Sequence, residues 1–531
     1  LYSVILMSGL IGLFNWEITA ISSNFISLML ILSISMNIHI INYYKLNYST
    51  TDKDINLKKT IQKMFWPCFY TSLTTAVAFG SLLFSNIKPL MDFGNIMIIA
   101  LSVILVTSFT ILPLLVLYFP KITVKKHLTF SILKNFYHIS ISHTKKIIMI
   151  NIIFFIISLI GIYELNVENS FINYFKSNTD IHKGMKLIDS ELGGTTPLDI
   201  LIKFNENEIL INQGENEGIE EETINEESLD LDLELDLDID LDENSMQENS
   251  DIWFSEYKLT TIKKIHEYLE SKDEIGKVQS LYSLINMANL INRSDLSLFE
   301  LSILYNQIPN DYKELLINPY LSIDSNMIKI SARIKDSNDI KRNKLILDID
   351  NFINNEFVNI KEYKVNGLLV LYNNMLQSLF SSQIKSYGMI IISIFLMFLI
   401  LFKSIKLSII GIIPNIIASS AILGIIGLLK IPLDIMTITI AAITIGIAVD
   451  NTIHYIYRIK ENIMKYNKRE ELIENTHMNV GNAILTTSIT IAFGFSVLSL
   501  SNFIPTILFG IFTSLAMIIA MLGVMLTLPA V

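Results

Sequence analysis

Long apolar segments constrain this chain more than any other feature. Ten of them are candidate membrane spans, and several approach or exceed the roughly twenty residues that a helix needs to cross a bilayer. They lie at 1–14, 20–43, 66–85, 92–118, 146–164, 383–402, 406–429, 433–456, 482–500 and 506–531. Backbone in hydrocarbon must satisfy its own hydrogen bonds, so such segments fold as helices. With 51% hydrophobic and 17% charged residues, the sequence predicts a polytopic α-helical membrane protein.

Lysine distribution predicts the orientation of these helices. Lysine and arginine gather in the connections 44–65, 119–145, 403–406 and 457–481. Because basic loops stay on the cytoplasmic side, these four connections should be cytoplasmic. The helices then alternate without conflict, and we expect segment 165–382 on the extracytoplasmic side.

The chain contains an internal repeat. With an offset of 415, residues 12–44 align with 427–459, which places His39 on His454. At an offset of 416, the pattern S-N-x-x-P-x-x-x-F-G starts at both Ser85 and Ser501. Both copies begin with a lysine-poor turn and an inward-directed helix, so we expect parallel repeats, one known way to build a secondary transporter.

Segment 165–382 has a soluble composition. Residues 196–204 and 326–335 have the alternation and β-branched residues of strands, whereas 253–272, 283–292 and 338–356 show helical periodicity. The sequence predicts an α+β domain of β-α-β pattern, followed by a helix over 372–388 that runs straight into the next span.

An acidic insertion interrupts this domain at about 206–251. It contains 19 Asp and Glu and no Lys or Arg, so the net charge of −11 becomes +8 without it. Its alternating carboxylates could chelate divalent cations. We favour a solvated, disordered loop, because dense and biased charge runs usually take that form.

One carboxylate, Asp450, lies near the end of an apolar run that starts around Pro432. An aspartate at the centre of a spanning helix costs roughly 2.5 to 3.5 kcal/mol even on the lowest scales, so it needs a partner, a watery cavity or a function. His454 is four residues away on the same helical face, with Asn451 and Thr452 nearby. This pair could pass a proton or hold a cation. The alternatives are a structural, hydrogen-bonded carboxylate and a histidine that meets water at the cytoplasmic end.

The first repeat lacks the carboxylate. Ser35 aligns with Asp450, Met36 with Asn451 and Asn37 with Thr452, leaving His39 as the titratable group. Either one carboxylate suffices, with Ser35 and Asn37 as hydrogen-bond partners across the interface, or coupling has been lost. Hydroxyls on neighbouring helices could face Asp450 or could simply pack helices together; the candidates are Thr74, Thr75, Thr487, Ser488 and Thr490.

Several motifs together resemble the resistance-nodulation-division superfamily, in its MMPL-type or hydrophobe-exporter branch, which is related to sterol-sensing-domain proteins. The motifs are GIAVDNTIH, SLLFSNIKPLMDFG, SVLSLSNFIPTILFG, GIIPNI and the stretch NSFINYFKSNTDIHKGMKLIDSELGGTTPLDI. The resemblance implies twelve helices in two repeats of six, each with an extracytoplasmic porter domain after its first helix.

Mapped onto this pattern, the chain lacks the first helix, first porter domain and second helix. It begins at Leu1 and stops at Val531 inside apolar runs, so we expect a piece of a longer protein. The expected parts are the end of the first transmembrane repeat with helices three to six (1–118), a cytoplasmic linker (119–145), the seventh helix (146–164), the porter domain (165–382) and the second repeat with helices eight to twelve (383–531).

The resemblance implies a secondary transporter that exports lipids or other hydrophobic molecules, driven by proton-motive force through Asp450. We expect no enzyme, metal centre, nucleotide cofactor or nucleic-acid partner, because catalytic and nucleotide-binding motifs are absent and Cys68 is the single cysteine. Expected partners are the hydrophobic substrate and membrane lipids, with periplasmic proteins and a homo-oligomer left open. The expected location is the bacterial inner membrane. The rivals are a non-transporting lipid or sterol sensor or scaffold, and an accessory subunit of protein translocation.

Overall fold

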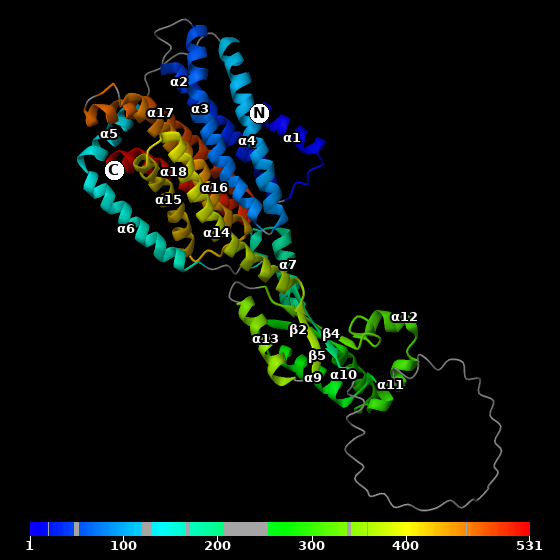
Figure 1. Ribbon diagram of the computed structural model, residues 1–531. Coiled ribbons are helices and arrows are strands. Elements are labelled where there is room, and N and C mark those ends of the chain that lie inside the picture. The colour runs from blue at the N-terminus through cyan, green and yellow to red at the C-terminus, as the bar shows by residue number, and fades with distance from the viewer. Residues whose placement is uncertain are drawn as a thin grey trace, which may run out of the picture. The chain divides into compact units, whose positions relative to one another are not determined.

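Nine helices among the described residues are long and apolar enough to cross a membrane. The computed structural model describes residues 1–19, 21–46, 53–85, 87–118, 129–165, 170, 172–205, 253–336, 341–357, 359–463, 465, 466 and 468–531. The nine helices are α2 (Phe25–Leu46), α3 (Lys53–Gly80), α4 (Lys88–Tyr118), α6 (Thr144–Tyr163), α14 (Leu368–Phe402), α15 (Ile405–Leu428), α16 (Ile435–Asn462), α17 (Arg469–Ser496) and α18 (Ile504–Leu522) (Figure 1). The predicted polytopic helical fold is therefore confirmed.

At the expected span 1–14 the structure has an apolar helix of 12 residues, α1 (Tyr2–Leu13), which is shorter than the nine spanning helices. The helix α14 starts at Leu368 and so includes the predicted helical entry 372–388. In the predicted linker, the described part contains α5 (Thr129–Ser142). The acidic insertion lies outside the described residues.

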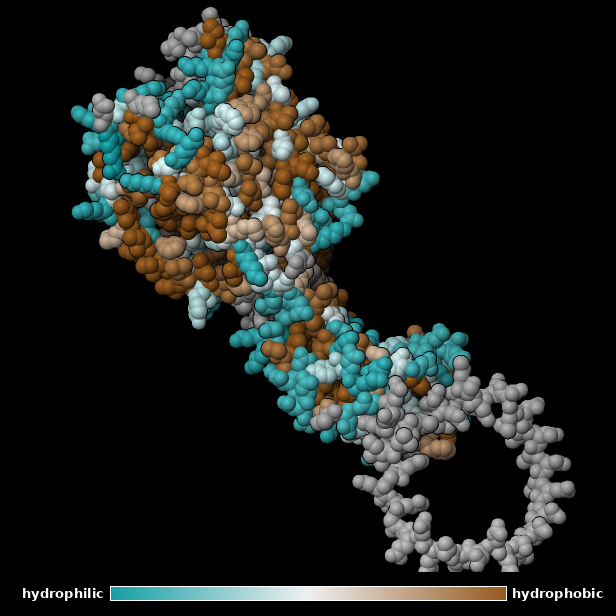
Figure 2. All heavy atoms as spheres, viewed as in Figure 1, coloured by the Kyte–Doolittle hydropathy of each residue, from teal (hydrophilic) through white to brown (hydrophobic). Residues whose placement is uncertain are grey.

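The chain divides into two compact units, a membrane unit (Leu1–Thr179 with Asn374–Val531) and a soluble unit (Asp180–Asn373). The expected porter domain was 165–382, wider than this soluble unit at both ends. On the face of the membrane unit in view, apolar residues cover most of the helix surface (Figure 2). Exposed Ile, Leu and Met side chains on α4, α6 and α14 contribute to the apolar exterior of the unit, which suits helices that face lipid.

Equivalent contacts recur in the two repeats of the membrane unit. A Cβ added to Gly94 would meet the Phe79 carbonyl and Leu82, and one added to Gly510 would meet the Phe495 carbonyl and Leu498. These residues correspond pairwise at the sequence offset of 416. Each copy also carries an edge-to-face phenylalanine pair, with ring centroids 5.7 Å apart for Phe79 and Phe93 and 5.9 Å apart for Phe495 and Phe509. Each helix pair is joined by a short 3₁₀ turn, η2 (Ser81–Phe84) or η6 (Val497–Leu500).

The two repeats cross each other in a reciprocal way. Helix α16 packs on α3, and its equivalent α2 packs on α17, the equivalent of α3. At the first crossing Gly446 lies against Ala78; at the second, Gly494 lies against Ile31. In the repeat alignment Gly494 corresponds to Ala78 and Ile31 to Gly446, so both crossings use the same pair of positions. This reciprocity is the mark of two parallel repeats related by a two-fold axis.

The soluble unit has a five-stranded antiparallel-paired sheet. Strands β1 (Thr196–Phe204) and β2 (Ile275–Gln279) each pair antiparallel with β4 (Met327–Ile334), while β5 (Ile360–Asn366) pairs with β1 and the short β3 (Leu321–Ser322) with β4. The predicted strands 196–204 and 326–335 are confirmed. Since β1 and β2 share an antiparallel neighbour, they run parallel and α9 (Glu256–Glu270) connects them. Helix α13 (Arg342–Glu356) connects β4 to β5 in the same way, which gives two interleaved β-α-β units of ferredoxin-like type.

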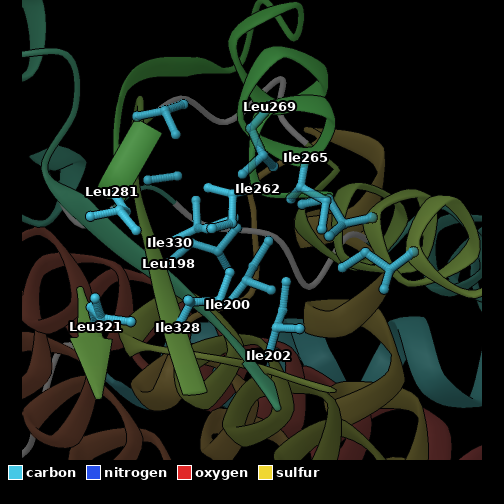
Figure 3. Close-up of a cluster of buried hydrophobic side chains, with 14 of the residues drawn as sticks. Leu198, Ile200, Ile202, Ile262, Ile265, Leu269, Leu281, Leu321, Ile328 and Ile330 are labelled. Carbon is cyan, nitrogen blue, oxygen red and sulfur yellow. The ribbon is translucent and has the colours of Figure 1, made fainter. Parts of the chain in front are cut away.

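The core of the soluble unit lies between this sheet and helices α9 and α13. Alternate residues of β1 point into it, so Leu198, Ile200 and Ile202 meet Ile262 and Ile265 of α9 (Figure 3). The other short helices of the unit are α7 (Asp180–Glu191), α10 (Leu281–Asn292), α11 (Leu298–Gln307), α12 (Asn310–Tyr312) and the π turn η5 (Lys313–Ile317). Helices α10 to η5 form an insertion between β2 and β3. The predicted helices 253–272, 283–292 and 338–356 correspond to α9, α10 and α13.

Within the membrane unit, α6 and α15 approach each other through small residues. A Cβ added to Gly424 would overlap the backbone of Ser158, and Gly161 and Gly427 meet in the same way. Small residues let helix backbones come close enough for extensive van der Waals contact in lipid.

Gly424→Ile is expected to destabilise the membrane unit by about 1–3 kcal/mol, because the added side chain has to displace backbone. The denaturant midpoint of the protein in detergent measures the change. Gly388→Ile is the matched control, since nothing lies within 4 Å of a Cβ at Gly388 in α14. Equal midpoints for the two variants would contradict the close crossing.

Candidate functional site

Helix α16 carries the candidate site at the centre of the membrane unit. Its start is fixed by Asp434, whose carboxylate accepts hydrogen bonds from the backbone amides of Met436 and Thr437, while the Thr437 hydroxyl accepts from the Asp434 amide. In the apolar 18-residue stretch of α16, 94% of the residues are buried inside the protein, a larger share than in any other described span. Every side of α16 therefore meets another helix, and a polar side chain on it must find partners there.

Asp450 meets both repeats. The Ser35 hydroxyl donates to Asp450 Oδ2 at 3.3 Å, and His39 Nε2 lies 3.6 Å from the same oxygen. On the other side, His454 Nε2 lies 3.3 Å from Asp450 Oδ1. The imidazoles are almost fully buried, and the Asp450 side chain is 17% exposed. We name Ser35, His39, Asp450 and His454 the Asp450 cluster.

The two histidines stack on each other. Their ring centroids are 3.9 Å apart and the planes differ by 10°. They occupy equivalent positions of the two repeats, as do Ser35 and Asp450. The cluster therefore sits where the pseudo-two-fold axis brings equivalent positions together, and the four side chains tie α2 to α16.

Asn451 and Thr452 bond to other helices of their own repeat and not to Asp450. The Asn451 amide donates to the Ser488 hydroxyl at 2.8 Å, and Thr452 Oγ1 accepts from the Asn415 amide at 3.1 Å. Sequence reasoning missed Asn415, although it is a fully buried polar residue in the apolar helix α15. The cost of burying a polar group, which drew attention to Asp450, would have found it.

The remaining candidates take different positions. Among the described residues, Asn37 makes no hydrogen bond to Asp450, so its position does not support the expected role as a cross-interface partner. Its amide oxygen is buried without a hydrogen-bond partner. Thr75 donates to the Gly446 carbonyl at 2.9 Å across the repeat interface. The hydroxyls of Thr74, Thr487 and Thr490 donate to carbonyls one turn back in their own helices, which is ordinary helix packing.

Two small pockets flank the cluster. One, of about 30 Å³, is lined by Asp450 and His454 together with Ser35, Cys68 and hydroxyls of α3. The other, of about 40 Å³, is lined by both histidines and by the charged residues Lys63, Arg458 and Glu461. A polar cavity needs roughly 10–15 Å³ to hold one water molecule, so each pocket has room for water. His454 borders both.

This fold and this buried cluster define the class: a multi-pass membrane protein with a two-repeat helical bundle. Residues 364–531 match the profile of the MMPL family, which confirms the predicted resemblance over this part of the chain. A protein of Methanocaldococcus jannaschii, MJ1562, which is described as a membrane protein, is 26% identical over 275 residues, covering 51% of this chain and 69% of the relative.

Two solved structures have a similar fold. The translocon-associated membrane protein SecDF of Thermus thermophilus aligns with a TM-score of 0.56 at 11% identity, covering 100% of this chain and 56% of that one. The hedgehog release protein Disp of the water bear Hypsibius dujardini aligns with a TM-score of 0.57 at 14% identity, covering 95% of this chain and 62% of that one. The chain thus spans less than two thirds of either structure. None of the four matches is to an enzyme family.

Ser488→Ala is expected to destabilise the membrane unit by roughly 1–3 kcal/mol, because it leaves the buried Asn451 amide without its acceptor. The unfolding midpoint in detergent reports this. Ser496→Ala serves as control, since the Ser496 hydroxyl is exposed and donates to a carbonyl of its own helix. A Ser488→Ala midpoint as high as that of the control would show that the Asn451 bond is dispensable.

Proposed function

We propose that this protein is part of a secondary transporter in which protons pass through the Asp450 cluster and drive export of lipids or other hydrophobic molecules. The observation that carries the proposal is the position of Asp450: a single carboxylate held by side chains of both repeats. Protonation there changes a contact between the two halves of the bundle.

The cluster has the parts that a proton path needs. His39 Nε2 lies 3.6 Å from the Asp450 carboxylate across the interface, and His454 Nε2 lies 3.3 Å from it on the same helix. Imidazoles in general can carry protons near neutral pH. The pocket with Lys63, Arg458 and Glu461 gives water a place on one side of the histidines, and the smaller pocket gives it a place beside Asp450. Protons would move between these pockets through His454 and Asp450, with His39 and Ser35 contributing from the first repeat.

Coupling follows from charge. An ionised Asp450 accepts from Ser35 and attracts a protonated His39 or His454, and this attraction is strong where water is scarce. A protonated Asp450 loses most of it. Each protonation step would therefore change the free energy of contact between α2 and α16, and rocking of one repeat against the other would follow.

An apolar pocket in the soluble unit supports a hydrophobic cargo. It measures about 260 Å³ and is lined by the insertion α10 to η5, including Leu284, Ala288, Leu301 and Leu304. The lining is almost entirely apolar, with the phenols of Tyr305 and Tyr312 as its polar groups. Such a pocket suits an aliphatic chain or another apolar molecule and offers nothing to a charged one.

We further propose that the protein works in the bacterial inner membrane with membrane lipids around it, without a metal or nucleotide cofactor for transport. Periplasmic partner proteins and a homo-oligomer are compatible with this arrangement. The second candidate is a non-transporting lipid sensor or scaffold. It is favoured by one observation: the first repeat has Ser35 where a second carboxylate would stand.

Asp450→Asn is expected to abolish lipid export driven by a pH gradient, because an amide keeps the size of the side chain but cannot exchange a proton. The measurement uses the full-length protein in proteoliposomes with a fluorescent phospholipid, with and without the gradient. Asp54→Asn, an exposed carboxylate in the first turn of α3, is the matched control. Binding of lipid without transport in the wild type would favour the sensor or scaffold.

Filling the apolar pocket tests the cargo. Ala288→Trp should weaken binding of the fluorescent lipid by roughly tenfold or more. The indole would fill space that an apolar group of the lipid otherwise occupies, and burying one such group contributes about 1–3 kcal/mol to the binding free energy. Leu187→Trp on the exposed face of α7, outside the pocket, should leave binding unchanged. Equal binding by both variants would remove the pocket from the export path.

A further inference from the structure

The Nε2 atom of His39 is buried without a hydrogen-bond partner. Only 2% of the His39 side chain is exposed. The Asp450 Oδ2 atom is 3.6 Å from His39 Nε2, beyond hydrogen-bond distance. A buried nitrogen without a partner costs free energy, so this atom is poised for a ligand.

Three donor atoms surround the same point. His39, Asp450 and His454 each offer one ligand atom, and these three atoms lie within 4.8 Å of one another. His39 Nε2 is 3.6 Å from Asp450 Oδ2, and His454 Nε2 is 3.3 Å from Asp450 Oδ1. Ligands about 2.0–2.2 Å from a tetrahedral zinc ion stand about 3.3–3.5 Å apart, so each imidazole is already close to the required spacing from one oxygen of the carboxylate.

We propose that His39, Asp450 and His454 bind a divalent transition-metal cation of the Zn²⁺ type. Two imidazoles and one carboxylate suit Zn²⁺ or Co²⁺ better than Mg²⁺ or Ca²⁺, which favour all-oxygen sites. A water molecule from the small pocket beside Asp450, or the Ser35 hydroxyl, completes four ligands. Three protein ligands and one open position are also the pattern of accessible zinc sites.

Binding requires one rearrangement. The imidazoles stack in parallel with centroids 3.9 Å apart, which aims their nitrogen lone pairs side by side. To converge on one ion the rings must tilt out of the stack. The metal-bound site therefore has a different interface between α2 and α16 from the metal-free site.

The metal would act as a clamp between the repeats. One ligand comes from α2 in the first repeat and two come from α16 in the second. Resting on the proposed function, this predicts that Zn²⁺ inhibits transport, since it occupies the atoms of the proton path and resists separation of the two repeats.

Cobalt titration of the full-length protein in detergent tests the site, because tetrahedral Co²⁺ gives a visible absorption band and needs no transport. We expect one Co²⁺ per chain by absorption and by elemental analysis, displaced by Zn²⁺ and not by Mg²⁺. His39→Gln and His454→Gln should each weaken binding by at least about 100-fold, since losing a group that merely supports a ligand already costs 10- to 100-fold. His143→Gln, an exposed histidine before α6, should bind as the wild type does.

The outcomes separate this proposal from the proposed function. If folded wild type gives no saturable cobalt band, or if His39→Gln binds as tightly as His143→Gln, the metal site is wrong whatever the transport assay shows. If cobalt binds as expected and the wild type transports no lipid, the site stands and the transport proposal fails. Elution of each variant as a single peak in size exclusion verifies that it is folded.

Discussion

An aspartate inside a helix bundle is the constraint on which the rest of the membrane unit depends. Asp450 lies among packed helices and draws its partners from two different parts of the chain: Ser35 and His39 lie about 400 residues before it, and His454 lies one turn after it. Ser35 and His39 can contact Asp450 only if the two repeats pack with equivalent positions facing each other. Close crossings at Gly446 and Gly494 hold α16 against α3 and α17 against α2, one helix of each pair coming from each repeat.

The packing residues of the two repeats follow the two-fold relation closely, whereas the polar residues at the centre of the bundle do not. Gly94 and Gly510 meet equivalent groups, and the phenylalanine pairs beside them have nearly the same separation. At the centre, equivalent positions carry serine in one copy and aspartate in the other, whereas the histidines match. Packing residues thus preserve a common backbone, while the titratable groups differ between copies. This is expected if the backbone arrangement serves both halves and the proton needs a single acceptor.

Much of this could be predicted from the sequence. Apolar run length predicts nine of the spanning helices, and alternation along Leu198, Ile200 and Ile202 predicts a strand buried on one face. The repeat alignment paired Ser35 with Asp450 and His39 with His454, but pairing in an alignment does not specify contact. Ring stacking, and the direction in which Asn37 or Thr74 points, depend on helix rotation by tens of degrees, which periodicity does not determine. Asn415 escaped because an amide among isoleucines leaves a weaker signal than a charge.

The single carboxylate has a thermodynamic consequence for any machine built around it. Moving one elementary charge through a potential of 100 mV releases about 2.3 kcal/mol, and each tenfold concentration ratio of an uncharged cargo requires about 1.4 kcal/mol. With one proton per turnover, such a potential sustains a cargo gradient of only about 50-fold. A bundle with an acceptor in each repeat could square that ratio. In the proposed transporter, Ser35 in place of a second acid would therefore limit export to cargo that moves down its gradient or only slightly against it.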